Sequence, residues 1–470
     1  MFELIVCVDN KNGIGKDNTI PWYIINDLKR FKIITTTSPD DKINVVIMGN
    51  STFKSIGKKL SNRINIVLTK STNNMNEEDL LYFNNKESIL MYIYNNMDKI
   101  NKVFIIGGSK IYQMFLELQI VDTIHLTKIK HNYECDTFLD TNLINKYYKE
   151  INNISFVRLV GKEREKDNND VEVNFITLKY QNKEELSYLT LLDKIINKGT
   201  YKIDRTEVGI FSLFGKHLKF NVRNWRLPLY SHRKMFYRGI IEELLFFLRG
   251  ETDTTVLKDN GVKIWQGHTS REFLNSRKLY NYKEGEYGPM YGYLLRHWGY
   301  PYKGLDHDYT NKGFDQLQYV IDEIKTNPTS RRILLSYWNP SVFNEQPLYC
   351  CHVLYQFYVN IDKHEISCMF TMRSNDAILA NNFNLVSCTL LLFIICKLTG
   401  YMPGKVVYSV NDCHIYKNQI DAYNQFKDNE PKTFPLCYIN DFEKVEDLKF
   451  SDFNIMFYSS HKAYKIPMSI

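Results

Sequence analysis

The sequence predicts an N-terminal α/β domain built on a doubly wound mixed sheet, followed by a C-terminal α+β domain. The chain has 470 residues, which is more than one ordinary hydrophobic core accommodates. Short apolar runs alternate with helical patterns in residues 1–180, as in α/β folds. After them, a long apolar run at 385–396 lies between alternating, strand-like segments. We therefore expect domains at 1–180 and 186–470, joined by a short junction at 181–185.

The N-terminal domain is expected to begin with a strand at Phe2 and to end with a strand near Tyr180. A helix should open near Asp27, which shares a face with Phe31 one turn later. An acidic residue in a first helical turn is by default a solvated charge that the helix dipole favours. The remaining expected elements are buried strands at Val45–Gly49, Arg63–Thr69 and Val103–Gly108, and a helix over Ser51–Gly57.

The C-terminal domain should begin with a helix near Leu186. An amphipathic helix is expected around Glu242–Leu245, where a paired glutamate is by default a solvated charge. The segment after Cys351 alternates apolar and aromatic residues, so this cysteine should enter a strand from a turn. The apolar run at 385–396 is too short to span a bilayer and reads as a buried core helix that ends at Gly400.

Composition restricts the class of protein. The chain carries nine cysteines, an odd number without a repeating spacing or a Cys-x-x-Cys motif, which indicates reduced thiols in the cytosol and no metal site. The first residues already belong to the fold, so no targeting segment and no membrane partner are expected. The net charge of +7 is modest and suits anionic substrates, and no nucleic-acid partner is expected.

The most informative arrangement is Cys351-His352, which lies between Arg331-Arg332 and Arg373-Ser374. A lone intracellular cysteine is by default a small buried hydrophobe. Nearby guanidinium groups favour the nucleophilic thiolate, and their planar forks hold phosphate. The spacing therefore predicts a thiol nucleophile that acts on a small phosphorylated electrophile.

Ser330-Arg331-Arg332, Trp338-Asn339-Pro340, Cys351-His352, Arg373-Ser374 and Phe383-Asn384, in this order, resemble thymidylate synthase over Leu186–Ile470. The resemblance implies that Cys351 adds to C6 of dUMP, that 5,10-methylenetetrahydrofolate is the cosubstrate, and that Glu243 organises proton transfer. It also implies a homodimer, in which the arginine pair reaches the partner's phosphate. The implied dUMP-binding residues are Arg205, Arg331, Arg332, His352, Gln356, Arg373, Ser374, Asp376, Asn384, His414 and Tyr416, and the implied folate-binding residues are Trp265, Tyr291, Leu379 and Phe383.

The first 180 residues resemble dihydrofolate reductase, through the strand at Phe2, the helix with Asp27, and Gly107-Gly108 after an apolar strand. The resemblance implies that Asp27 is the catalytic carboxylate, that Arg63 grips the folate tail, and that NADPH is the cofactor. The implied folate-binding residues are Ile5, Leu28, Phe31, Ile56, Arg63, Ile106 and Thr127, and the implied cofactor-binding residues are Cys7, Gly15, Gly49, Thr52, Thr69, Lys70, Gly107, Gly108 and Tyr112.

Together the two halves resemble the bifunctional reductase–synthases of protists and plants. The implied function is a thymidylate cycle, in which dUMP is methylated and the resulting dihydrofolate is reduced. Two alternatives are a chain with one degenerate site and a non-catalytic RNA-binding scaffold. The first is motivated by departures from the family pattern: Asn50 at a usual basic position, Glu207, Ala380 and Asn411 at usual glycines, Asn382 at a usual proline, and the altered segment Leu227–Arg233.

Overall fold

A computed structural model describes residues 1–71, 76–158, 171–204 and 206–468. The chain divides into two compact units, Met1–Asn182 and Lys183–Ile470. The helix that opens the second unit begins at Lys183 rather than near Leu186. Glu184 and Glu185 lie in its first turn, where the helix dipole favours negative charge. Part of the predicted junction is therefore helical.

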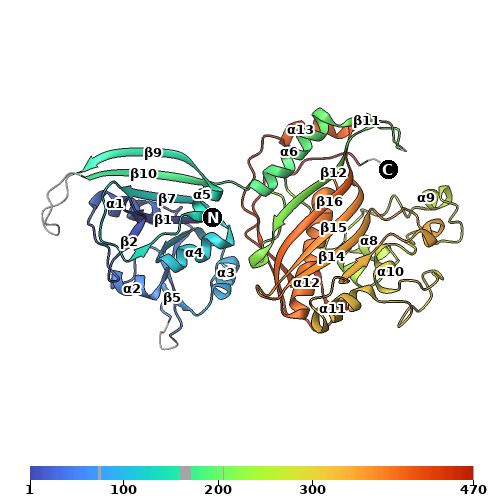
Figure 1. The fold of residues 1–470 in the computed structure, drawn as a ribbon, viewed down its shortest axis with the longest axis horizontal. Coiled ribbons are helices and arrows are strands. Elements are labelled where there is room, and N and C mark those ends of the chain that lie inside the picture. Colours follow the sequence, from blue (N-terminus) through green and yellow to red (C-terminus); the bar gives the residue numbers. More distant parts are fainter. Residues whose placement is uncertain (72–75, 159–170, 205, 469–470) are drawn as a thin grey trace. The chain divides into compact units, whose positions relative to one another are not determined.

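The first unit is a doubly wound mixed sheet, as predicted (Figure 1). Its strand order is β5-β4-β3-β6-β1-β7-β10-β9, with parallel pairs up to β7 and antiparallel pairs at β10 and β9. The strands are β1 (Phe2–Val8), β3 (Ile43–Gly49), β4 (Ile64–Leu68), β5 (Leu80–Phe83), β6 (Ile100–Gly107), β7 (Val121–Ile129), β9 (Tyr148–Arg158) and β10 (Val171–Tyr180), and a separate pair is formed by β2 (Gly13–Gly15) and β8 (Thr137–Phe138).

Helices cover both faces of this sheet. Phe31 and Phe53 pack on the face that carries Ile5, whereas Phe115 contacts Phe2, whose side chain points to the opposite face. Gly57, with φ of 75°, ends the second helix in the left-handed conformation that glycine adopts without strain. The helices are α1 (Ile25–Thr36), α2 (Asn50–Ile56), α3 (Lys86–Asn95), α4 (Ser109–Leu118) and α5 (Asn142–Tyr147).

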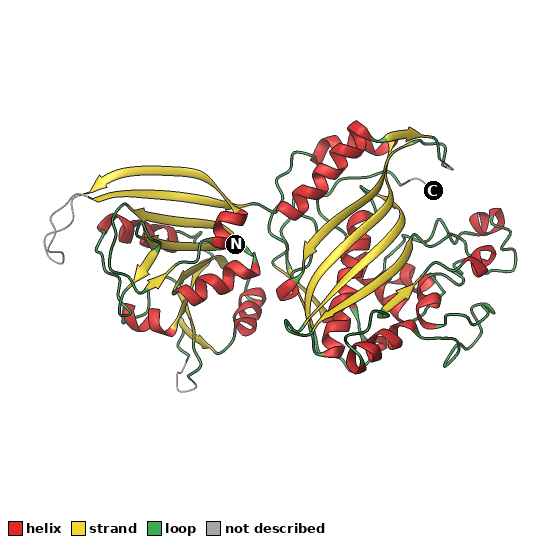
Figure 2. Ribbon diagram, viewed as in Figure 1, coloured by secondary structure: helices red, strands yellow, loops and turns green. Residues whose placement is uncertain are grey.

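The second unit is built on a six-stranded sheet with the order β11-β12-β16-β15-β14-β13, which Figure 2 shows as one curved layer. Its pairs are antiparallel except for β15 with β16. The strands are β11 (Thr200–Lys202), β12 (Ile210–Asn221), β13 (Leu334–Ser336), β14 (His352–Asn360), β15 (Glu365–Asp376) and β16 (Met402–Tyr416), and a separate pair is formed by β17 (Leu436–Ile439) and β18 (Phe453–Met456).

The predicted apolar helix is α12 (Asn381–Thr399), which packs against β15, β16 and α7 and ends at Gly400. Within the described ranges it is also the one helix long and apolar enough to cross a membrane, but most of it is buried in the protein core. The other α-helices are α6 (Lys183–Lys198), α7 (Tyr237–Leu248), α8 (Thr255–Asp259), α9 (Arg271–Ser276), α10 (Tyr291–Arg296), α11 (Gln316–Thr326) and α13 (Ile420–Phe426). Short 3-10 helices are η1 (Arg223–Trp225), η2 (Pro340–Glu345), η3 (Lys417–Gln419), η4 (Val445–Asp447) and η5 (Phe450–Asp452).

Candidate active sites

Asp27 lies in the first turn of α1, beside the paired strands β1 and β7. Burial raises the pKa of its carboxyl above the usual range, although hydrogen bonds from Thr127 and Cys7 and the charge of Arg30 partly oppose this. Cys7 and Thr127 are direct partners in the β1–β7 register, so the sheet presents both side chains to one carboxylate. The solvated first-turn charge that is the default for this position does not describe Asp27.

Arg30 is a member of this group that the sequence analysis did not identify. One guanidinium nitrogen donates to Thr127 Oγ1 at 3.2 Å, and the guanidinium carbon lies 4.6 Å from the centre of the Phe175 ring. Helical spacing places Arg30 near Asp27, but only the fold reveals that β7 and β10 complete the site.

Most of the apolar residues expected around the Asp27 carboxylate belong to one hydrophobic cluster. Ile5 and Ile106 are buried, and Phe31 and Ile56 pack against the same cluster. Leu28 is 46% exposed, so its side chain faces solvent and is not part of this buried cluster. Four of the five predicted apolar contacts therefore gather in one cluster.

Arg63 is only 4% exposed and is held in place by its neighbours. It donates to Thr35 Oγ1 at 2.6 Å and to the Ser61 carbonyl at 3.0 Å, and it lies 5.9 Å from the Phe31 ring. Burial lowers the pKa of its guanidinium, so an anionic ligand would compensate for lost hydration. A folate carboxylate fits this position.

The predicted cofactor residues gather where α2 and α4 begin. Gly49 and Gly108 precede these helices. A Cβ added at Gly108 would make an ordinary contact with Thr52 Oγ1 at 3.4 Å, and one at Gly49 would make a tight contact with Ile111 at 3.3 Å. Both glycines stand at helix N-termini, where backbone N–H groups favour anions. These residues fit a dinucleotide diphosphate.

Two further predicted cofactor residues, Gly107 and Tyr112, lie at the end of β6 and in α4. The Tyr112 hydroxyl donates to the Ile5 carbonyl at 2.9 Å, and burial raises its pKa. Gly107, with φ of 125° and a cis bond to Gly108, has a conformation suited to glycine. The structure places the other predicted cofactor residues in β1 (Cys7), in β2 (Gly15) and after β4 (buried Thr69, exposed Lys70). Asn50, which stands at a usual basic position, is the first residue of α2.

In the second unit, Cys351 immediately precedes β14, as predicted. Its backbone N–H donates to the Tyr291 hydroxyl at 2.7 Å, and Arg373 Nη2 lies 3.8 Å from its sulfur. Arg373 is fixed by the carbonyls of Tyr349 and Cys350, both at 2.9 Å. Cys350 is buried, and burial raises the pKa of its thiol well above the usual value. Cys351 therefore has the electropositive environment that a nucleophilic thiol needs, and Cys350 does not.

His352 joins two side chains behind the nucleophile. Its Nε2 lies 3.0 Å from Asn384 Oδ1, and its Nδ1 lies 2.6 Å from the Tyr355 hydroxyl. Burial lowers the pKa of His352 to about 4, so the imidazole is neutral at physiological pH. Tyr355 is a second residue that sequence reasoning missed.

Glu243 lies on α7 and is connected to Cys351 through Trp265 and Tyr291. The Trp265 indole N–H donates to its carboxylate at 2.7 Å, and Trp265 lies 6.2 Å from Tyr291, the partner of Cys351. Burial raises the pKa of Glu243 to about 7, although the Trp265 hydrogen bond acts in the opposite direction. A carboxyl group that titrates near neutrality is suited to moving protons.

Asp376 lies at the end of β15, next to predicted folate contacts. It accepts hydrogen bonds from the backbone N–H groups of Ile378 and Leu379 and from the side chain of Gln419 at 2.6 Å. Burial nevertheless raises its pKa. Gln419 also donates to the Pro467 carbonyl at 3.1 Å, which links this carboxylate to the C-terminal segment. Phe383, a predicted folate contact, is partly buried against the hydrophobic core of the second unit.

His414 and Tyr416 lie on β16, next to Ser374 of the parallel strand β15. His414 Nδ1 is 3.4 Å from Asp412, whose pKa is held well below its usual range by His414, Lys202 and Ser212. Arg205, the predicted phosphate ligand preceding β12, lies outside the described residues.

Three predicted dUMP contacts are not brought to Cys351 within one chain. Arg331, Arg332 and Gln356 are exposed. Gln356 donates to the Arg331 carbonyl at 3.5 Å, on the sheet face that also exposes Tyr358. A cavity of about 500 Å³ on this face is lined by residues including Arg331, Gln356 and Tyr358.

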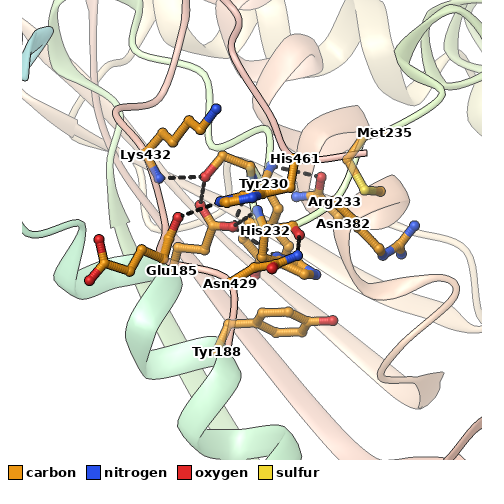
Figure 3. A network of polar contacts seen from close by, with 12 residues as sticks. Glu185, Tyr188, Tyr230, His232, Arg233, Met235, Asn382, Asn429, Lys432 and His461 are labelled. Atoms are coloured by element: carbon orange, nitrogen blue, oxygen red, sulfur yellow. Dashed lines mark hydrogen bonds and ion pairs between the residues drawn. The ribbon is translucent and has the colours of Figure 1, made fainter. Parts of the chain in front are cut away.

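The altered segment Leu227–Arg233 is buried throughout and belongs to a polar network (Figure 3). Glu185 accepts hydrogen bonds from both the backbone N–H and the side chain of Ser231 and of His232, at 2.7–2.8 Å. Asn382 accepts from the Tyr230 N–H at 3.0 Å and donates to the Pro228 carbonyl at 2.8 Å. The changes in this segment and at Asn382 are therefore accommodated by specific hydrogen bonds.

The substituted glycine positions differ in their backbone. Glu207 has φ of 60°, in the left-handed region that disfavours a side chain. Ala380 has φ of −97°, and Asn411 is part of β16, so neither position requires glycine for backbone reasons. Of these three departures, only Glu207 carries backbone strain.

Comparisons with known proteins agree with this arrangement. The family model of dihydrofolate reductase matches residues 1–179, and that of thymidylate synthase matches residues 186–470. A bifunctional dihydrofolate reductase-thymidylate synthase from Zea mays is 37% identical over 507 residues, covering all of this chain and 97% of the relative.

Two protist relatives bear the same name. The protein from Paramecium tetraurelia is 36% identical over 479 residues, with 100% of this chain and 99% of the relative aligned. The protein from Leishmania major is 34% identical over 502 residues, with 100% of this chain and 95% of the relative aligned. The chain therefore belongs to the family of bifunctional dihydrofolate reductase–thymidylate synthases, with an oxidoreductase domain followed by a methyltransferase domain.

Proposed function

We propose that the synthase site methylates dUMP with 5,10-methylenetetrahydrofolate and that the reductase site returns the dihydrofolate product to tetrahydrofolate with NADPH. The observation that carries the proposal is the series of contacts that connects Arg373 to Cys351 and, through Tyr291 and Trp265, Cys351 to Glu243. Arg373, Cys351 and Glu243 supply a phosphate-binding cation, a nucleophile and a proton carrier. The alternatives of a degenerate site or an RNA scaffold leave this grouping without a role.

At the synthase site, the Cys351 thiolate adds to C6 of the pyrimidine, and C5 then attacks the methylene carbon of the folate. Loss of the C5 proton releases tetrahydrofolate and leaves a methylene group on C5. Hydride from tetrahydrofolate then adds to this methylene group, the C5–C6 double bond re-forms as the Cys351 thiolate leaves C6, and the products are dTMP and dihydrofolate. Glu243 moves protons during these steps, because its carboxyl exchanges them near neutral pH. Arg373 and Ser374 bind the phosphate, and His414 and Tyr416 bind the ribose hydroxyl.

Asn384 reads the uracil edge of the nucleotide, supported by the hydrogen bond from His352. We assign Asp376 to the folate ring rather than to dUMP, because it accepts a hydrogen bond from the backbone N–H of Leu379, an expected folate contact. Trp265, Tyr291, Leu379 and Phe383 shape the folate pocket. Gln419 is a further supporting residue, since it holds the Asp376 carboxylate at 2.6 Å.

At the reductase site, Asp27 holds the pteridine ring and supports its protonation, because burial keeps its carboxyl protonated to higher pH than in water. Arg63 binds the folate carboxylate. NADPH, when bound, supplies the hydride. The backbone at Gly49, Gly107 and Gly108, together with Thr52 and Tyr112, holds its diphosphate, and Lys70 is the cation for its 2′-phosphate in place of a residue at Asn50.

The enzyme is proposed to act as a homodimer through the outer face of the synthase sheet. Arg331 and Arg332 are exposed on this side, so they are free to reach the phosphate of the partner's site. We also place the enzyme in the cytosol, since all nine cysteines are free thiols.

One coupled assay tests the proposal. The purified protein receives dUMP, methylenetetrahydrofolate and NADPH, and dTMP and NADP⁺ are quantified in the same samples over time. The expected result is NADP⁺ formation that depends on dUMP and approaches the amount of dTMP. dTMP without NADP⁺ would contradict the reductase half, and the absence of dTMP would contradict the synthase half.

A further inference from the structure

A chain of hydrogen bonds runs from Tyr355 through His352 to Asn384. Tyr355 and His352 are 3% and 7% exposed, and the two contacts measure 2.6 and 3.0 Å. A register shift between β14 and β15 at His352/Leu354 brings His352 and Tyr355 to the same face, although residues three apart in a regular strand point to opposite faces.

The chemistry of the three groups gives this chain a direction. A neutral imidazole carries one hydrogen, on either Nδ1 or Nε2. When the Tyr355 hydroxyl donates to Nδ1, the hydrogen resides on Nε2, which then donates to Asn384 Oδ1. The low pKa of His352, about 4, keeps the ring in this neutral form.

The opposite direction is unfavourable because of what surrounds Tyr355. Its neighbours include the rings of Tyr337 and Phe370, the thiols of Cys368 and Cys388, which are poor acceptors, and Tyr291. Among the described residues, His352 is the one hydrogen-bond partner of the Tyr355 hydroxyl. If Nδ1 donated to the tyrosine, the hydroxyl hydrogen would be buried without a good acceptor. The tyrosine hydroxyl therefore favours one tautomer of His352 and one orientation of the Asn384 amide.

That orientation distinguishes two pyrimidines. Asn384 directs Oδ1 toward His352 and keeps a second lone pair on this oxygen, and its amide nitrogen, which also interacts with the Tyr408 hydroxyl, has a second N–H. Uracil offers a carbonyl at C4 and an N–H at N3, which complement an amide in this orientation. Cytosine offers an amino group and a bare nitrogen at the same positions, which place donor against donor and acceptor against acceptor.

We propose that Tyr355 is a positioning residue that sets the preference of the synthase site for uracil over cytosine nucleotides by fixing the His352 tautomer and the Asn384 amide. The inference rests on the proposed role of Asn384 as the group that reads the base. It extends the specificity machinery to a side chain that does not touch the nucleotide.

The test measures dissociation constants for dUMP and dCMP in the full-length enzyme and in three variants. Tyr355→Phe removes the hydroxyl but keeps the ring. Tyr337→Phe is the matched control, since Tyr337 is buried with its ring 6.0 Å from His352 but is not its hydrogen-bond partner. Asn384→Ala removes the base-reading group itself.

The preference for uracil is the dissociation constant for dCMP divided by that for dUMP. We expect this ratio to fall about tenfold in Tyr355→Phe, because both orientations of the Asn384 amide become accessible, and to be unchanged in Tyr337→Phe. An unchanged ratio in Tyr355→Phe, with a lowered ratio in Asn384→Ala, would overturn the inference alone. An unchanged ratio in Asn384→Ala would overturn the proposed role of Asn384. Equal losses in both tyrosine variants would show a packing effect and would also reject the inference.

Discussion

The indole N–H of Trp265 donates to a carboxylate oxygen of Glu243 at 2.7 Å, and the Trp265 ring lies 6.2 Å from Tyr291, whose hydroxyl accepts from the Cys351 N–H. This hydrogen bond favours the charged carboxylate, whereas burial favours the neutral acid. Burial is the larger effect and raises the pKa of Glu243 to about 7. The carboxyl group is thus mostly protonated below neutral pH and mostly ionised above it.

Glu243→Gln should lower the methylation rate by about 10²–10⁴-fold, the usual contribution of a positioned acid or base. Glutamine keeps the acceptor for Trp265 but cannot exchange the proton. The change of rate that the native enzyme shows around pH 7 should therefore be absent in the variant. Rates of dTMP formation between pH 5.5 and 8.5, measured under saturating substrate, check this expectation.

The neighbouring Glu242→Gln is the control for this experiment. Glu242 lies one position earlier on α7 and is paired with Arg238 at 3.9 Å. It should keep both the rate and its pH dependence. If the rate of dTMP formation by Glu243→Gln still changed around pH 7, the titrating group would be a residue other than Glu243.

Asp27→Asn and Cys351→Ser should separate the two activities. Asp27→Asn keeps the hydrogen-bonding shape at the pteridine but removes the ionisable carboxyl, so dihydrofolate reduction should fall by about 10²-fold or more while dTMP formation remains. Cys351→Ser should abolish dTMP formation and leave reduction intact, because a serine hydroxyl is a poor nucleophile without an activating base. Each activity is measured alone with its own substrates.

The native protein and a surface variant such as Lys29→Met serve as references in both assays. If either site variant lost both activities while remaining folded, the assignment of one reaction to each site would be refuted. Circular dichroism and the activity of the untouched domain establish folding in the same sample.

The groups that sequence reasoning identified and those that it missed differ in a physical way. Asp27 and Cys351 belong to local motifs, and their predicted roles came from the family resemblance that these motifs carry. Tyr355 and Gln419 act through approaches that no local pattern encodes, and although helical spacing places Arg30 near Asp27, its contacts with Thr127 and Phe175 come from distant strands. A register shift turns Tyr355 toward His352, and Gln419 reaches Asp376 across 43 positions of the chain.

The strands and the long apolar helix were predictable for a related reason. Buried strands such as β3 and the core helix α12 are marked by continuous apolar runs, and Gly400 marks the end of that helix. The start of α6 was less predictable, since polar residues in its first turn resemble a linker. The backbone conformation of Glu207 also required the structure, because its sequence context alone only identified an unusual residue.

Arg30→Met should shift the pH dependence of the reductase to higher pH. Arg30 lowers the pKa of Asp27 through its charge, so its removal leaves burial less opposed and raises that pKa further. Because the protonated carboxyl supports protonation of the substrate, the decline of the rate with rising pH should begin at higher pH. Reductase rates from pH 5 to 9 under saturating NADPH provide the measurement.

Lys29→Met is the matched control for Arg30, since it removes one positive charge from the adjacent, exposed position of α1. Its pH profile should coincide with that of the native enzyme. A profile that moves equally in both variants would indicate a general effect of net charge, and one that moves to lower pH in Arg30→Met would contradict the electrostatic argument.

Glu207→Gly should stabilise the synthase domain by about 1 kcal/mol, because a residue with a side chain in the left-handed region carries a cost of this size. Glu207 has φ of 60°. Its side chain is exposed, so replacing it by glycine removes no buried contact. The midpoint of urea unfolding, followed by fluorescence, should rise. Ala380→Gly is the comparison: with φ of −97° that position carries no such strain, so glycine should stabilise nothing there.

Two inactive variants should restore synthase activity when their subunits are mixed, if Arg332 acts on the partner's site. In a mixed dimer of Cys351→Ser and Arg332→Glu, one site carries both lesions and the other carries neither. Random reassortment after mild denaturation and refolding should return about a quarter of native activity. Activity is measured as dTMP formation before and after reassortment.

Mixing Cys351→Ser with Arg373→Glu should restore nothing, because Arg373 lies 3.8 Å from the Cys351 sulfur of its own chain and both sites remain damaged. Absence of recovery in the first pair would place Arg332 in its own subunit's site, and recovery in the second pair would place Arg373 in the partner's site.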